Sequence, residues 1–488
     1  MHNLKSIKTN FIMNCALTLS SVVFPLISFP YVSRVLSPSG IGRVSFATSV
    51  ISYFMMFAQM GIPTYGIRTC SKVRDNKRKL NTTVREILTI NLILCVCVYA
   101  VFYILLFTVP RFNEDKILLI IVSLSIGFNA LGVEWLYRAL EEYSYISIRS
   151  IVFKFIALVL MLVLIRNSDD YLIYGALTIF AAVGSNVLNF INLRKHVDFK
   201  DCDQLNIFQH FKPISVFFGM SIAATIYSNM DTVMLGFMKT NDDVGFYNAA
   251  VKIKNVLVSV VTSLGAVLLP RASYYYENKL ETEFFKITKK ALNFVFISAG
   301  SLTVFFMMFS KESILALSGA QFESAIPAMV LIMPTLLLIG ISNIIGLQML
   351  VPMGKERLVL YSEIAGAVVN VIINTLLIPR MSSSGAAIGT VAAELVVVIV
   401  QVYYLKDIII KDVKQIQIMK IAVSISVASI ASYMCKHLMF GSIMTLIIAA
   451  IVFYFIMGLL LIVLKEKFII ETVMPTIRRF IEKVFRRV

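Results

Sequence analysis

Apolar runs of about 20 residues recur along the whole chain and are separated by short polar loops. A membrane-spanning helix needs ~20 residues at a rise of ~1.5 Å per residue, so each run is long enough to cross a bilayer. The pattern predicts fourteen helical spans, at 11–32, 44–64, 86–108, 117–137, 147–165, 171–192, 213–238, 245–269, 291–310, 327–351, 358–379, 385–405, 418–438 and 442–464. We therefore expect an all-α integral membrane protein.

The first apolar run begins a retained span rather than a cleaved leader. It is longer than the ~7 to 15 residues of a signal-peptide core and shows no convincing cleavage site. Pro25 and Pro30 lie inside this run, and we expect them to kink the helix.

A short motif appears twice and suggests an internal repeat. Residues 34–42 end in Gly-Ile-Gly and precede Ala47, while the polar turn 239–243 is followed by Gly245 and then Ala250. Parallel repeats are a recurrent transporter architecture. The motif predicts two halves of six spans, an N-terminal lobe at 1–212 and a C-terminal lobe at 213–410. Residues 411–488 would add two further helices and a basic tail.

Composition agrees with the membrane assignment. The 488 residues are 58% hydrophobic and 15% charged, and their mean hydropathy is +0.83. The net charge of +17 does not indicate nucleic-acid binding, because the basic residues are spread between apolar runs rather than gathered on one face. The six Cys and four His show no metal-ligand or redox spacing, so we expect no metal and no cofactor.

The distribution of Lys and Arg predicts the orientation. With an even number of spans both tails lie on one side, and 33 of the 45 basic residues fall on that side. Nine fall on the opposite side and three lie within spans. The positive-inside rule therefore places both termini in the cytoplasm.

The seventh and eighth predicted spans carry charges in mid-segment. Asp231 and Lys252 lie at nearly equal distances on either side of the turn at 239–243, so an antiparallel hairpin would place them at about the same depth, with Lys254 nearby. A charge inside the bilayer costs ~2.5 to 3.5 kcal/mol or more and usually faces a cavity or a bundle interior. Polar residues line one face of the eighth span at helical spacing: Asn248, Lys252, Asn255, Ser259 and Thr262.

Three more charges are candidates for function or for structure. Glu134 and Lys154 are symmetric about the turn near Ser144 and could pair, or could each reach water at the interface. Glu394 lies in the twelfth span, close to the small residues Gly389 and Ala393.

Small and amide residues mark two further features of the second half. Asn370 and Asn374 share a face of the eleventh span with Glu363, as cavity lining or as interhelical hydrogen bonds. Gly385 and Gly389 are spaced as in a close helix contact.

One motif imitates an enzyme. Asp201-Cys202-Asp203 resembles the metal-binding pair of a glycosyltransferase. Its loop has about 20 residues and no room for a nucleotide-binding domain, so we do not expect an enzyme.

A family resemblance is carried by residues 14–50, 61–68, 134–141 and 231–236. In these stretches the chain resembles the Wzx-type bacterial polysaccharide flippases of the multidrug and oligosaccharidyl-lipid exporter superfamily. The resemblance is specific in the first half and becomes looser after residue 290. It implies two six-helix lobes around a central cavity. It also implies transfer of an undecaprenyl-diphosphate-linked oligosaccharide from the cytoplasmic to the outer leaflet of a bacterial inner membrane by alternating access, with a coupling ion (H⁺ or Na⁺) left open.

The intramembrane charges fit that substrate, because a diphosphate requires a cationic cavity. The candidates for the substrate cavity are Arg34, Asp231, Lys252, Lys254, Asn255 and Asn370, and those for a coupling or structural charge are Glu134, Lys154 and Glu394. The resemblance also implies membrane lipids and the polymerase and chain-length proteins of the same pathway as partners.

Two rival functions remain. A multidrug or cation antiporter of the same superfamily would be expected to have an acidic cavity, which intramembrane Lys disfavours. An O-antigen polymerase would be expected to have a large outer loop, and the longest outer loop here is only 311–326.

Overall fold

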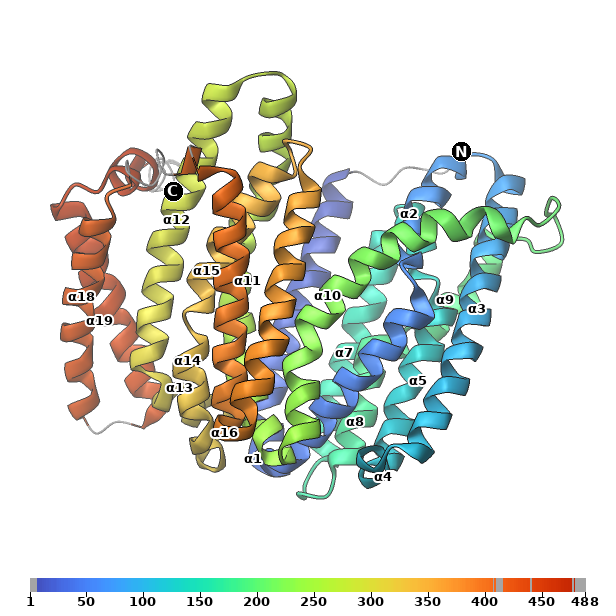
Figure 1. Cartoon of the computed structure of the whole chain (residues 1–488), viewed down its shortest axis with the longest axis horizontal. Helices are drawn as coiled ribbons and strands as arrows, with labels where there is room; N and C mark the ends of the chain where they lie inside the picture. Colours follow the sequence, from blue (N-terminus) through green and yellow to red (C-terminus); the bar gives the residue numbers. More distant parts are fainter. Residues whose placement is uncertain (1–6, 407, 410–415, 439–440, 476–477, 479–488) are drawn as a thin grey trace, which may run out of the picture. The chain divides into compact units, whose positions relative to one another are not determined.

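The computed structural model describes residues 7–406, 408–409, 416–438, 441–475 and 478, and in this part of the chain every regular element is a helix (Figure 1). The basic tail predicted at the C-terminus lies mostly outside these residues. The chain divides into two compact units, Met1–Asn248 and Ala249–Val488. Each unit is described by itself.

The first unit contains the helices before residue 239 and the first turns of the next one. They are α1 (Ile7–Gln59), α2 (Ile62–Val73), α3 (Lys77–Thr108), α4 (Pro110–Glu114), α5 (Lys116–Gly132), α6 (Glu134–Ala139), α7 (Tyr143–Leu164), α8 (Tyr171–Ile179), η1 (Phe180–Gly184), α9 (Asn186–His196), η2 (Ile207–His210) and α10 (Phe211–Met238). A buried apolar cluster joins α2, α3 and α6 around Trp135 and Tyr137.

The first two predicted spans form one helix. Within α1, the non-helical backbone falls at Ser37, with φ 64° and ψ 169°, while Pro25 and Pro30 lie inside the helix, and the kinks expected at these two prolines remain a prediction. The α conformation is disfavoured for a residue that precedes proline, here Pro38, and this explains the position of the break.

The two copies of the repeated motif meet at this break. A Cβ on Gly245 would lie 2.1 Å from the Pro38 carbonyl oxygen, and one on Gly42 would lie 1.8 Å from the Asn241 carbonyl oxygen. Only glycine permits so close an approach of two backbones. The repeated Gly therefore has a packing reason: it joins the middle of α1 to the start of α11 (Asn241–Glu277).

The loop that leads to α10 is fastened along the first turns of α3. Asn81 donates to the Asp201 carbonyl oxygen at 3.1 Å, and the Thr82 hydroxyl accepts from the Asp203 amide at 2.8 Å. This linker and α10 belong to the first compact unit. The lobe boundary at residue 212 remains a prediction.

The second unit begins within α11. It continues with α12 (Glu281–Met308), α13 (Ser310–Ser318), η3 (Ala320–Ala325), α14 (Ile326–Ile332), α15 (Thr335–Asn343), η4 (Ile344–Leu350), α16 (Glu356–Tyr404), α18 (Ile418–Tyr433), η5 (Met434–Leu438), α19 (Ser442–Val463) and η6 (Ile469–Val473). Its apolar core is built mainly by α12, η4 and α19.

The eleventh and twelfth predicted spans are also one helix, α16. Its backbone breaks at Ser382, with φ 48° and ψ −127°, so the two halves fold against each other. A Cβ on Gly385 would lie 2.6 Å from the Leu377 carbonyl, and one on Gly389 would lie 2.0 Å from Asn374 Oδ1. The predicted close contact at these two glycines is confirmed.

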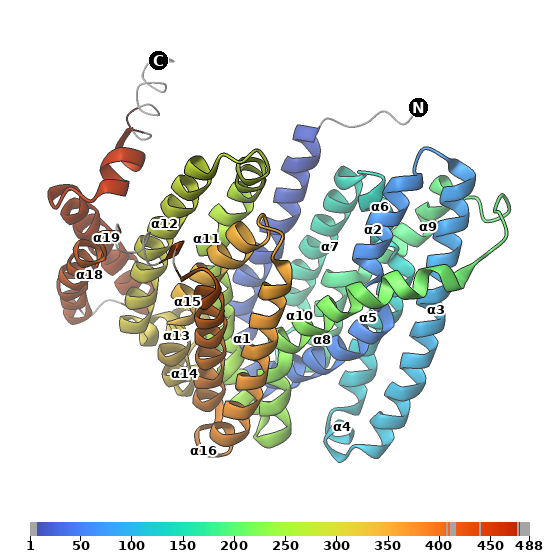
Figure 2. The same cartoon turned by 45° about the horizontal axis from the view of Figure 1, so that its top comes forward.

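The last two helices pack as a pair on α12 and α13. Helices α18 and α19 lie side by side in both views (Figures 1 and 2), and α18 contacts α12 while α19 contacts α13. Glu466, which follows α19, is fully buried and accepts hydrogen bonds from Asn293 Nδ2 at 3.2 Å and from the Ile469 amide. The final pair is therefore anchored to α12 by a buried carboxylate.

The count of spans differs from fourteen. Among the described residues, ten helical segments are long and apolar enough to cross a membrane, and a bent pair at Ala320–Ile332 and Thr335–Leu350 makes eleven. Two of these ten segments, Ile12–Val73 and Glu356–Tyr404, each contain two predicted spans. Helix α10 is not one of the ten segments. The protein is an all-helical, multi-pass membrane protein with ten to eleven candidate spans.

Candidate functional site

The predicted hairpin turn is present between α10 and α11. Helix α10 ends at Met238 and α11 begins at Asn241. The turn is closed by Thr240, whose hydroxyl donates to Asp243 Oδ2 at 2.7 Å. Two aspartates in the first turn of α11 also favour its start, because carboxylates are stabilised at a helix N-terminus.

Asp231 is buried in α10, as an intramembrane carboxylate should be, with 8% of its surface exposed. The Tyr247 hydroxyl of α11 donates a hydrogen bond of 2.7 Å to Asp231 Oδ2. Sequence analysis missed this partner, although Tyr247 lies sixteen residues away across the same hairpin. Asp231 is thus held by the start of α11, within the first unit.

The two other candidates on α1 and α7 have local partners. Arg34 is exposed, and its Nη1 donates to the Pro30 carbonyl oxygen one turn earlier. Lys154 donates to the hydroxyls of Ser20 at 3.0 Å and Ser21 at 2.8 Å. These hydroxyls lie on α1, so the Lys154 ammonium ties α7 to α1 inside the membrane-spanning part of the unit.

Glu134 does not use Lys154 as its ion-pair partner. Its Oε1 accepts from Arg138 Nη2 at 2.7 Å and from Nε at 3.0 Å, one turn along α6. The α5–α6 junction is sharp, because Val133 has φ 39°. Of the two alternatives for Glu134 and Lys154, the structure does not show the ion pair, and each side chain has a separate contact.

In the second unit, α11 is amphipathic within its span. Ile253, Leu257 and Val261 are buried on one face, while Asn255 and Ser259 are exposed on another. Lys252 and Lys254 are both half-buried, and only Lys252 lies beside that polar face, since Lys254 is about 200° round the helix from Lys252. Polar side chains exposed along a membrane helix indicate an aqueous or ligand-lined surface rather than lipid.

Asn370 and Glu394 lie on opposite halves of α16 and are both buried. Asn374 Nδ2 donates to Asn370 Oδ1 at 3.1 Å, and Gly389 packs directly on Asn374. The structure therefore joins this amide pair to the contact between the two halves. Glu363, on the same helix as the amides, is half-buried.

Sequence analysis missed a buried ion cluster in the first unit. The carboxylate of Asp115 is fully buried and lies 2.9 Å from Arg43 Nη1 and 3.5 Å from Arg111 Nη1. Arg111 also donates to the Gly236 carbonyl oxygen of α10 at 2.8 Å. All three side chains lie at the ends of predicted spans, so the sequence does mark their positions. Basic residues at span ends, however, are ordinarily used only to predict which side of the membrane a loop lies on.

A second missed network is centred on Glu86 of α3. His210 Nε2 lies 2.7 Å from Glu86 Oε2, and the Tyr65 hydroxyl lies 2.6 Å from His210 Nδ1. The Asn206 amide donates to Glu86 Oε1 at 2.5 Å. The network binds the linker before α10 to α2 and α3, and its members are too far apart in sequence for a local pattern to reveal.

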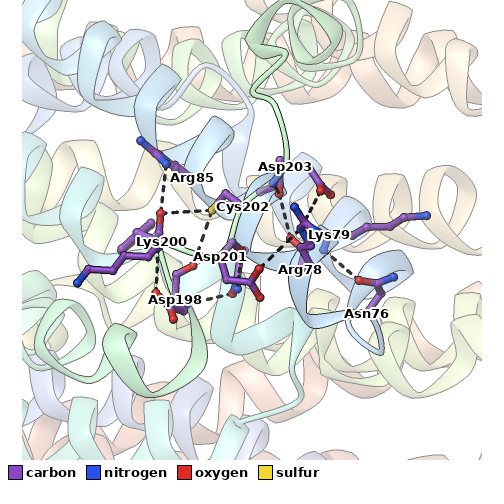
Figure 3. Close-up of polar contacts among 12 residues, drawn as sticks. Asn76, Arg78, Lys79, Arg85, Asp198, Lys200, Asp201, Cys202 and Asp203 are labelled. Carbon is purple, nitrogen blue, oxygen red and sulfur yellow. Dashed lines mark hydrogen bonds and ion pairs between the residues drawn. The ribbon is translucent and has the colours of Figure 1, made fainter.

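The motif that imitates a glycosyltransferase is occupied by an arginine. Arg78 Nε lies 2.8 Å from Asp203 Oδ1 and 3.7 Å from Asp201 Oδ1, so both carboxylates face α3 (Figure 3). Within the described residues no group of three or more His, Cys, Asp and Glu side chains could hold a metal ion.

A comparison with protein families decides the identity. The model of the family described as "Polysaccharide biosynthesis protein" matches residues 7–276, more than half of the chain. The chain belongs to this family. The match ends near the point where the Wzx-type resemblance becomes looser, and it contains nearly the whole first unit and most of α11.

Relatives of this polysaccharide biosynthesis family protein extend the match beyond residue 276. A "Putative O-antigen transporter" of Escherichia coli K12 is 21% identical over 83% of this chain and 98% of its own length. A protein of the same description from Shigella dysenteriae is 25% identical over 78% of this chain and 95% of its own length. The capsular polysaccharide biosynthesis protein CapF of Staphylococcus aureus is 22% identical over 77% and 93%.

Solved structures establish the fold of this family member. The lipid II flippase MurJ, in an inward closed conformation, has a TM-score of 0.75 over 93% of this chain and 100% of its own, with 14% identity. An inward-facing multidrug transporter of the MATE family has a TM-score of 0.62 over 83% of this chain and 99% of its own, with 15% identity. At these identities the comparison shows a MurJ/MATE-like fold alone.

Proposed function

We propose that the protein transfers an undecaprenyl-diphosphate-linked oligosaccharide from the cytoplasmic to the outer leaflet of a bacterial inner membrane, as a transporter and not as an enzyme. The observation that carries the proposal is the match to relatives described as O-antigen transporters over nearly their whole length. The MurJ-like fold supports it, since MurJ is described as a lipid II flippase.

The proposed mechanism is alternating access, and an ion gradient of H⁺ or Na⁺ would drive it. The proposal needs fourteen crossings with both termini in the cytoplasm. This number is reached if α1 and α16 each cross the membrane twice, turning back at the breaks at Ser37 and Ser382, and if α10 also crosses. Bends at non-helical residues make each long helix into two shorter ones.

The polar face of α11 is the proposed place where the diphosphate binds. Lys252 supplies positive charge on the side of α11 that carries Asn255, inside a membrane span, and Lys254 adds a second charge about 200° round the helix. Anionic groups are attracted to cations most strongly where the dielectric constant is low. Arg34, Asp231 and the α16 amide Asn370 stay candidates for the substrate cavity. Glu134, Lys154 and Glu394 stay candidates for coupling or structure.

Deletion of the gene tests the function. We expect loss of surface polysaccharide and accumulation of the lipid-linked oligosaccharide in the cytoplasmic leaflet, with both reversed by the wild-type chain. Accumulation of unpolymerised lipid-linked oligosaccharide in the outer leaflet would point to a polymerase instead. Increased sensitivity to cationic drugs with normal polysaccharide would point to an antiporter.

Complementation with Lys252 variants tests the site. Lys252→Ala removes a cation from the proposed diphosphate site, so we expect less surface polysaccharide than with Lys252→Arg, which keeps the charge. Lys239→Ala, in the turn before α11, is the matched control. Equal export by Lys252→Ala and wild type, at equal amounts of protein in the membrane, would reject this role for Lys252.

A further inference from the structure

A groove of about 680 Å³ lies between the start of α7 and the end of α9 in the first unit. That volume falls within the ~300 to 1,000 Å³ of small-molecule sites. Its lining includes the cations Arg149 and Lys195 and the apolar side chains Ile148, Val152 and Leu188. We call it the cationic groove, and no step of the proposed transport uses it.

Arg149 is the unusual member of the groove. Only 6% of its surface is exposed, and its Nη1 donates to the Ser185 carbonyl oxygen at 2.5 Å. Its Nε is buried and has no hydrogen-bond partner among the described residues. Because this Nε has almost no accessible surface, a ligand in the groove meets Arg149 through the positive charge of its guanidinium group rather than through that donor.

The apolar side of the groove faces outward from the unit. Ile148 is 56% exposed, Val152 47% and Leu188 41%. These residues belong to the candidate spans Tyr143–Leu164 and Tyr171–His196. Apolar side chains exposed on membrane-spanning helices contact lipid hydrocarbon, so the groove places a cationic floor next to a lipid-facing wall.

The groove lies at the membrane surface because both of its helices end there. Helix α7 begins at Tyr143, and α9 ends at His196 with Arg194, Lys195 and His196 in its last turn. Both ends border loops for which the basic residues predict the cytoplasmic side. Arg149 lies less than two turns into α7, at the depth of lipid headgroups rather than of the bilayer centre.

We propose that the cationic groove binds an anionic phospholipid of the cytoplasmic leaflet. The phosphate lies beside the positive charges of Arg149 and Lys195, and an acyl chain follows Ile148, Val152 and Leu188. Glu142 at the rim reduces the two positive charges to one when His196 is neutral, which matches the single charge of a phosphodiester. The diphosphate of a polyprenyl carrier is more negative and would be less well balanced.

The experiment measures lipid retained by the purified full-length protein. Native mass spectrometry in detergent compares phosphatidylglycerol with phosphatidylcholine over a range of added lipid. We expect preferential retention of phosphatidylglycerol. Lys195→Ala should weaken that retention about fivefold, the usual effect of one lysine near an anionic lipid. Arg149→Gln should weaken it about tenfold or more.

Arg194→Ala is the matched control, because Arg194 is exposed in the same turn of α9 and does not line the groove. It should retain phosphatidylglycerol like the wild type. If Arg149→Gln does not accumulate because α7 loses its bond to Ser185, Lys195→Ala decides by itself. The measurement needs no transport, so its result is independent of the proposed function.

Two results would overturn the proposal. Equal phosphatidylglycerol retention by Lys195→Ala and Arg194→Ala would show that the groove does not bind lipid phosphate. Displacement of phosphatidylglycerol by a lower concentration of undecaprenyl diphosphate, lost in Lys195→Ala, would show that the groove takes the carrier lipid instead.

Discussion

The two compact units satisfy their buried polar groups differently. In the first unit, buried carboxylates face ionisable partners from other elements, as Asp115 faces Arg43 and Glu86 faces His210. In the second, buried Gln401 donates to the Ser362 hydroxyl, and even the fully buried Glu466 is held by amide nitrogens. Charge pairs and amide pairs can both join helices, but they respond differently to substitution.

The difference lies in the cost of breaking each contact. Removing one partner of a buried ion pair leaves a charge without compensation, at ~3 to 5 kcal/mol. Removing an interhelical amide or hydroxyl bond in a membrane protein costs on average ~0.6 kcal/mol. We therefore expect the helix contacts of the first unit to tolerate substitution poorly and those around α16 to tolerate it well.

The largest effect should follow Asp115→Ala. The change leaves Arg43 and Arg111 without their shared buried carboxylate, so we expect a loss of ~3 to 5 kcal/mol and little protein in the membrane. Membrane abundance and thermal melting in detergent are the measurements. Asp169→Ala, at an exposed loop position, is the control. Equal melting of the two variants would remove the basis of the comparison.

Glu86→Gln should have the next largest effect. The amide keeps the shape of the side chain but loses its charge. A nitrogen in place of Glu86 Oε2 would no longer accept hydrogen bonds from His210 and Gln209. We expect ~1.5 to 3 kcal/mol less stability, measured by melting. Glu283→Gln changes a half-exposed carboxylate and should be neutral. Limited proteolysis of the linker 197–206 should increase only in Glu86→Gln; unchanged cleavage would show that Glu86 does not hold it.

Gln401→Leu, in the second unit, should have a small effect. Ser362 keeps its own bond to the Val359 carbonyl at 2.7 Å, and Gln401 Oε1 has no hydrogen-bond partner among the described residues to lose. We expect stability within ~1 kcal/mol of the wild type, by the same melting assay. Ile399→Ala, on the exposed face of the same helix, is the control. A loss as large as that of Asp115→Ala would contradict the comparison.

The smallest effect concerns the partly exposed charge of Asp170. Asp170 Oδ2 accepts from the Arg166 and Asn167 amides, and these hydrogen bonds lower the pKa of the carboxyl group. A lowered pKa means that the stabilisation is present above the unfolded-state pKa and is lost as the pH falls through the folded-state value. Wild type should therefore melt slightly above Asp170→Asn at neutral pH, and the gap should narrow in acid. A gap that widens in acid would reverse the sign.

Local patterns predicted part of this molecule well. The turn at 239–243, the contact at Gly385 and Gly389 and the polar face of α11 depend on residues close in sequence, and the structure contains all three. The family resemblance, specific in the first half, was confirmed at the family level by the match at 7–276. The lobe boundaries, the orientation and the roles of the candidate residues remain predictions.

The amino-acid sequence by itself determined that this chain is a helical membrane protein, because the length and polarity of each run set its preference for lipid. It also determined where charge is expensive. Only the tertiary structure decided how those charges are satisfied: Asp231 with Tyr247, Lys154 with two serines, and Glu86 with His210, 124 residues apart. Hydropathy is a sum over neighbours in sequence, whereas a hydrogen bond requires atoms within about 3 Å, which packing alone brings together.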